Sequence, residues 1–119
     1  MILWIFMMFS CQNSVRGQIL ESSIARASPD GKSVLYQSFY EKQGDVFTSI
    51  DAWLEVGGLE GGGGVFNMVS KQFDTLQVLW TSDTTAVIAY PDRAIVSKQE
   101  PNLCFAGKTI HLSYKSVAH

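Results

Sequence analysis

The residue types that most often carry catalysis are few in this chain of 119 residues. It holds two histidines, His111 and His119, and two cysteines, Cys11 and Cys104. A nucleophilic triad needs a Ser or Cys, a His and an acid that converge, and no Gly-x-Ser-x-Gly turn occurs in the sequence. We expect His111 to be a solvent-facing strand residue and Cys104, between two apolar neighbours, to be a buried and inert thiol. No catalytic residue is therefore predicted, and the chain is expected not to be an enzyme.

One alternative keeps an active site open. In it the chain is a small enzyme or ligand-binding protein whose site is built from distant loops. Such a site would bring His111, Cys104 and an acid together in one pocket. Nothing near these residues in the sequence supports that arrangement.

Metal ions and cofactors are not expected either. Metal sites need clustered His, Cys, Asp or Glu, whereas the two cysteines are far apart and the eleven acids are spread along the chain. Asp45 with Asp51, or Asp83 with Asp92, would meet only through folding. The glycine-rich stretch 57–64 lacks the Lys-Ser/Thr ending of a phosphate-binding loop, and we expect a mobile loop between two strands.

Aromatic side chains are the remaining candidates for binding. Trp53, Trp80 and Tyr90, together with Tyr36 and Tyr40, could form a face on which a ligand or a partner stacks. The alternative is packing in the core. Trp80 in particular is expected to be a core anchor whose indole N–H needs an acceptor.

The charge of the chain argues against a nucleic-acid partner. Nine Lys and Arg residues and eleven Asp and Glu residues give a net charge of −2, and both signs are scattered. Binding to phosphates needs a basic patch or stripe. The sequence contains no such cluster.

The elements that would position these side chains are strands. Period-two alternation and short apolar runs between turn residues predict about eight short strands, and no helix stripe is seen beyond the N-terminal run. Strands without intervening helices predict antiparallel pairing in a sandwich or a curled sheet. The expected ranges are 18–27, 32–40, 45–56, 65–69, 75–81, 85–90, 93–97 and 109–114.

Three turns are specified by their residues. In Ser28-Pro29-Asp30-Gly31, the proline presets φ and the glycine accepts a positive φ, so this stretch is expected to close a hairpin. Residues 81–84 (Thr-Ser-Asp-Thr) predict a second hairpin in which side-chain oxygens bond turn amides. Pro91 is expected to end a strand because it has no N–H for the ladder.

The chain begins with nine apolar residues, MILWIFMMF, followed by Ser10 and Cys11. As a helix this run would rise only about 14 Å, which is too short to span a membrane and is the length of a signal-peptide apolar region. A small residue before a cysteine resembles the lipidation site of bacterial lipoproteins, so Cys11 is a lipidation candidate. Ordinary cleavage or anchoring, and a buried first strand or helix, are the alternatives. Residues 1–18 are thus an expected export segment and tether, and residues 19–119 a β domain.

Several motifs resemble a group of small bacterial envelope and lipoprotein-like proteins that bring no agreed activity with them. The shared pieces are the SPDGK turn and strand at 28–36, the Gly-Gly-Val-Phe at 63–66, the Val-x-Trp-x-Ser-Asp at 78–83 with the Tyr-Pro at 90–91, and the last strand at 109–114. A weaker resemblance is to single blades of TolB-type propellers, but a closed propeller needs at least about four blades of roughly 40 residues. The resemblance implies a β domain in the cell envelope.

The sequence as a whole predicts an extracytoplasmic β domain, held at the membrane by its N-terminus alone and without catalytic activity. It would bind another envelope protein through sheet edges or an aromatic face. The alternative is a cytoplasmic accessory or immunity-type protein with an uncleaved apolar first strand.

Overall fold

The computed structural model describes the backbone of residues 19–118 and the side chains of residues 24–118. Within this part of the chain there are nine strands, one more than predicted, and no helix. The predicted export segment, Cys11 and His119 lie outside the described residues. The strands are β1 (Ile19–Ala27), β2 (Ser33–Lys42), β3 (Asp45–Val56), β4 (Leu59–Ser70), β5 (Gln77–Trp80), β6 (Thr85–Pro91), β7 (Ile95–Gln99), β8 (Asn102–Phe105) and β9 (Lys108–Val117).

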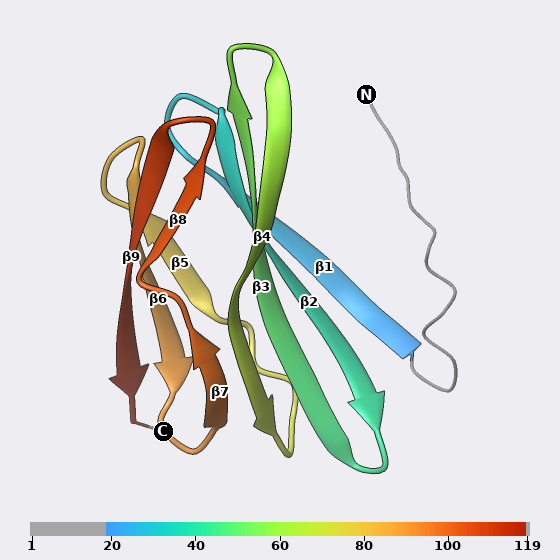
Figure 1. Cartoon of the computed structure of the whole chain (residues 1–119). Helices are drawn as coiled ribbons and strands as arrows, with labels where there is room; N and C mark the ends of the chain where they lie inside the picture. The colour runs from blue at the N-terminus through green and yellow to red at the C-terminus, as the bar shows by residue number, and fades with distance from the viewer. Residues whose placement is uncertain (1–18, 119) are drawn as a thin grey trace.

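The strands form two sheets that pack face to face (Figure 1). Sheet A has the order β1-β2-β3-β4-β7 and sheet B the order β5-β6-β9-β8. The predicted mainly β fold is confirmed, in its sandwich form. The expectation of antiparallel pairing throughout is wrong at one place, because β6 and β9 run parallel. After β6 the chain adds β7 to the edge of sheet A and returns through β8, which supplies the long crossover that a parallel pair requires.

Three hairpins close with two-residue turns in which both central residues have positive φ. They are Gln43-Gly44 between β2 and β3, Gly57-Gly58 between β3 and β4, and Ala106-Gly107 between β8 and β9. Positive φ at both positions matches the right-handed twist of the flanking strands. The Ala106-Gly107 turn creates the hairpin that the sequence analysis did not predict.

The glycine-rich stretch is a strand and not the mobile loop that we expected. Only Gly57 and Gly58 form the turn, and Gly61 to Gly64 lie inside β4, paired with β3. A Cβ built on Gly61 would lie 2.3 Å from the ring of Phe105 in sheet B, and one on Gly62 would lie 1.8 Å from the carbonyl oxygen of Ala52. Glycine is needed here because neighbouring strands approach the backbone too closely for a side chain.

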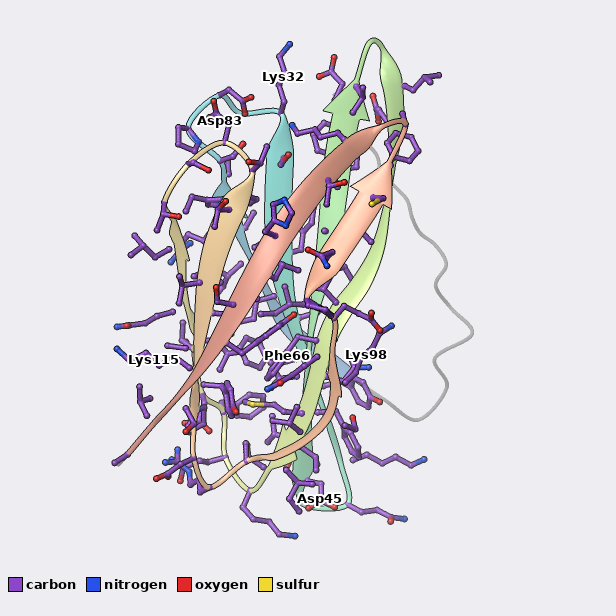
Figure 2. All side chains as sticks on the ribbon, turned by 60° about the vertical axis from the view of Figure 1, so that its left-hand side comes forward. Lys32, Asp45, Phe66, Asp83, Lys98 and Lys115 are labelled. Carbon is purple, nitrogen blue, oxygen red and sulfur yellow. The ribbon has the colours of Figure 1, made fainter. Side chains whose placement is uncertain are left out.

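The predicted turns at 28–31 and 81–84 both form, and they are joined to each other. The Gly31 N–H donates to the Ser28 carbonyl at 2.9 Å, and the Thr84 N–H donates to Ser82 Oγ at 3.2 Å. Asp83 Oδ1 accepts a hydrogen bond from the Asp30 N–H at 2.9 Å. The two turns therefore tie sheet A to sheet B at one end of the sandwich, where Figure 2 shows Lys32 and Asp83.

The predicted end of a strand at Pro91 is also found, because β6 ends there. Pro91 is buried, and the chain turns immediately after it. The next N–H, of Asp92, donates to the carbonyl of Val117 at 2.9 Å, and the Ala94 N–H donates to the Pro91 carbonyl at 3.1 Å. The missing N–H of Pro91 thus falls at the end of the ladder, where it costs no bond.

The core lies between the sheets and follows the alternation of the strands. Along β2 and β3 every second side chain is buried, as with Leu35, Ile50 and Leu54. Phe66 is fully buried, with its ring centroid 5.4 Å from that of Tyr90 and 5.5 Å from that of Tyr114 (Figure 2). Both tyrosines come from sheet B, so this cluster joins the two layers.

Two side chains, Gln37 and Tyr114, form hydrogen bonds with segments that are distant in the sequence. Gln37, on the buried face of β2, accepts a hydrogen bond at Oε1 from the Leu76 N–H at 2.7 Å, where the chain passes from sheet A to sheet B. The Tyr114 hydroxyl of β9 lies 2.8 Å from the Glu100 carbonyl and 3.0 Å from the Val65 carbonyl. Burial raises the pKa of Tyr114 to about 12, against the opposing effect of its bond to the Glu100 carbonyl.

Candidate binding face

The outward side of sheet A, which we call the outer face, carries four aromatic side chains that are exposed or half-buried. Sheet B covers the opposite, inner side of sheet A. The register of the strands places Tyr36 beside Asp51, and Tyr40 beside Phe47. Trp53 lies one row further along β3, between Val34 and Gly62. Figure 2 shows Lys98 of sheet A and Lys115 of sheet B on opposite sides of Phe66, and these lysines mark the outward sides of the two layers.

The three predicted binding residues are not brought together. Trp53 lies on the outer face, half-buried, and its indole N–H donates to Glu60 Oε1 at 3.3 Å. Trp80 and Tyr90 pack against the core between the sheets. The Trp80 indole N–H donates to the Arg26 carbonyl at 3.0 Å, and thus β5 is fastened to β1.

A hollow lies on the outer face between β2, β3, β4 and β7. Its volume is about 350 Å³, and it is lined mainly by Tyr40, Phe47, Ser49, Asn67, Val69 and Ser97, with Thr48 and Met68. The rings of Tyr40 and Phe47 stack on each other with centroids 5.0 Å apart and an interplanar angle of 12°. Ser97 is the extra residue where the register between β4 and β7 shifts. Such a bulge leaves its residue out of the ladder and bends the strand.

A second hollow of about 410 Å³ adjoins the first at Val69, and charged side chains line it. Lys71 forms an ion pair with Asp45 at 2.6 Å. Arg93 forms an ion pair with Asp74, whose carboxylate is mostly buried. The charged side chains of the second hollow are therefore paired in opposite signs. Ile95, with 70% of its surface exposed, completes this end of the outer face.

Asp51 and Lys98 are two charged residues of opposite sign that lie near each other further along the outer face. Both side chains lie over the backbone of Gly64. A Cβ atom built on Gly64 would be 3.0 Å from Asp51 Oδ1 and 3.6 Å from Lys98 Nζ. Desolvation by the surrounding strands raises the pKa of the Asp51 carboxyl, and the positive charge of Lys98 acts in the opposite direction.

His111 and Cys104 lie on neighbouring strands of sheet B, on its outward side. His111 is exposed, and its Nδ1 lies 2.8 Å from Asn102 Oδ1. Cys104 is also exposed, with its Sγ 3.0 Å from Thr109 Oγ1, so the prediction of a buried thiol is wrong. The alternation of β8 explains the difference, because Leu103 and Phe105 face the core and turn Cys104 outward. Neither residue lines the hollows described above.

Two of the acids that would meet only through folding, Asp45 and Asp83, have other partners. Asp45 binds Lys71, and Asp83 accepts the hydrogen bond from the Asp30 N–H. Among the residues that the structure describes, no group of three or more His, Cys, Asp or Glu side chains could hold a metal ion.

Sequence reasoning named Tyr40 but missed the other residues of the hollow. The available signal was the period of two along β3, which places Phe47, Ser49, Asp51 and Trp53 on one face.

Comparison of the chain with protein-family models, with curated proteins and with solved structures gave no match. Within the described part of the chain, no helix is long and apolar enough to cross a membrane.

Proposed function

We propose that the chain is a non-catalytic binding domain that contacts its partner through the outer face of sheet A. The observation that carries the proposal is the gathering of Tyr36, Tyr40, Phe47 and Trp53 on a face that sheet B leaves uncovered. Aromatic residues are enriched in protein interfaces, where they supply most of the binding energy. On an open sheet face, such residues favour partner binding over a role in stability.

The partner that the sequence predicts is another envelope protein. We further propose that residues 1–18 hold the domain at the membrane, through lipidation at Cys11 or through cleavage or anchoring of the apolar run. The support for this is the apolar run and the Ser10-Cys11 pair that follows it. Fractionation of cells that express the chain with and without Cys11→Ser tests the lipid, since loss of the lipid should release the domain from membranes.

A photo-crosslinking experiment in cells tests the binding face. A photoreactive benzoylphenylalanine replaces Tyr36, which is 38% exposed on the outer face, or Leu79, which is 63% exposed on the outward side of sheet B. Both positions accept a bulky residue without disturbing the core. We expect a discrete adduct from position 36 and none from position 79. Equal adducts from both positions, or none from position 36, would show that the outer face is not the binding surface.

A further inference from the structure

We propose that the hollow on the outer face binds one sugar ring of a neutral glycan, an inference that rests on the proposed binding function and names its ligand. The sugar could belong to a polysaccharide or to a glycan on a protein partner, since both present the same chemistry.

The first support is the aromatic wall of the hollow. Tyr40 and Phe47 stack on each other and are both half-buried. A stacked pair of this kind is rigid, and each ring uses only one of its faces for the other. The C–H groups on one side of a pyranose ring form an apolar patch that packs against an aromatic face. The pair therefore offers a firm platform for a ring-shaped ligand.

The second support is a set of polar side chains without partners. Ser49, Asn67 and Ser97 line the hollow, and within the described residues no hydrogen bond engages their side chains. Together they offer hydroxyl groups that both donate and accept, and one amide that does the same. Ser97 also brings the backbone groups that its bulge takes out of the ladder. Sugar hydroxyls, which also donate and accept, match such a set.

The third support is charge. The charged side chains of the adjoining hollow are already paired, Lys71 with Asp45 and Arg93 with Asp74. A charged ligand would have to compete with these ion pairs. Neutral hydroxyl and amide groups line the hollow itself, and Lys98, the register partner of Asn67, lies outside these two ion pairs. A lining of this kind suits a polar ligand without net charge. The volume of about 350 Å³ lies at the small end of ligand pockets, which suits a single ring better than a helix or a strand.

Titrations followed by backbone amide resonances of the labelled domain test the proposal. The probes are cellotetraose, N-acetylchitotetraose and mannotetraose, each at millimolar concentration. We expect at least one of them to shift the resonances of residues 47, 49, 67 and 97. Two further arms distinguish the sources: a soluble polysaccharide of the sugar that binds, and a glycoprotein that carries it, before and after enzymatic removal of its glycans.

Matched variants connect binding to the hollow. Asn67→Ala should weaken binding about tenfold, the usual effect of losing one or two hydrogen bonds. Asn102→Ala, the same change on the outward side of sheet B, should leave affinity unchanged. Phe47→Leu should weaken binding about tenfold through loss of stacking, whereas Phe73→Leu, outside the hollow, should not. Melting curves of all four variants confirm that they are folded.

The proposal is overturned if none of the sugars shifts these resonances, or if Asn67→Ala and Asn102→Ala bind equally well. Its failure can be separated from that of the proposed function. If position 36 cross-links to a protein without glycans while no sugar binds, the outer face is a binding surface and its ligand is not a glycan.

Discussion

Replacing Gln37 by methionine removes one acceptor from the core and keeps the shape of the side chain. Gln37 is 3% exposed, and its Oε1 accepts a hydrogen bond from the Leu76 N–H, which is buried as well. Without the side-chain oxygen of Gln37, the Leu76 N–H has no acceptor, and an unsatisfied buried donor costs roughly 1–3 kcal/mol. We expect the free energy of unfolding to fall by about 2 kcal/mol. With a urea m-value of about 2 kcal/mol/M, the midpoint should fall by about 1 M.

The assay is urea unfolding followed by tryptophan fluorescence, with Gln99→Met as the matched control. Gln99 is exposed, and its amide donates to the Tyr90 hydroxyl at a long 3.3 Å. Losing this bond should change the free energy of unfolding by less than about 0.5 kcal/mol. If the two variants unfold at the same urea concentration, the bond from Leu76 does not hold the sheets together and the reasoning is refuted.

Three further predictions concern single positions. Thr48→Val should raise the free energy of unfolding by about 1 kcal/mol, because Thr48 Oγ1 is buried without a partner in the described structure; a lower melting temperature would reveal a bound water. Gly62→Ala should lower the free energy of unfolding by at least about 2 kcal/mol, because the new Cβ would clash with the Ala52 carbonyl. Gly63→Ala should change the free energy of unfolding by less than about 1 kcal/mol, because its Cβ would lie 3.9 Å from its nearest contact. Equal melting temperatures of the two variants would contradict this prediction. Tyrosinate absorbance should show a component near pH 12 that Tyr114→Phe removes. Because folding raises this pKa above its ordinary value of 10.0, its contribution to stability is complete below pH 10 and is lost as the pH rises to about 12; a chain whose tyrosines all titrate together near pH 10 would refute it.

The sequence predicted elements whose signal is local. The strand at 45–56 has the predicted bounds, because its alternation is long and turn residues flank it. The hairpin at 28–31 forms because proline and glycine fix its dihedrals. A run of glycines gives no local signal for a strand. Gly61 and Gly62 are needed in β4 because Phe105 and the Ala52 carbonyl leave no room for a Cβ, and these contacts exist only in the folded chain.

The candidate site was harder to predict for a related reason. Trp53, Trp80 and Tyr90 are alike in type, and only strand register decides that the first faces outward while the other two pack inside. The hollow depends on the register shift at Ser97, and no glycine or proline in β7 marks this bulge in the sequence. Side-chain type therefore pointed to aromatic binding, while the position of the binding face came from the arrangement of the strands.

The parallel pair of β6 and β9 has a consequence for how the chain folds during synthesis. The hairpins of β1 to β4 use neighbours in the sequence and can form as soon as they leave the ribosome. Sheet B cannot do so, because its second central strand, β9, follows all the other described strands in the sequence. Until residues 108–117 emerge, the apolar inner side of sheet A faces water. A ribosomal pause or a truncation before residues 108–117 would thus leave the apolar side of sheet A exposed to chaperones and to aggregation.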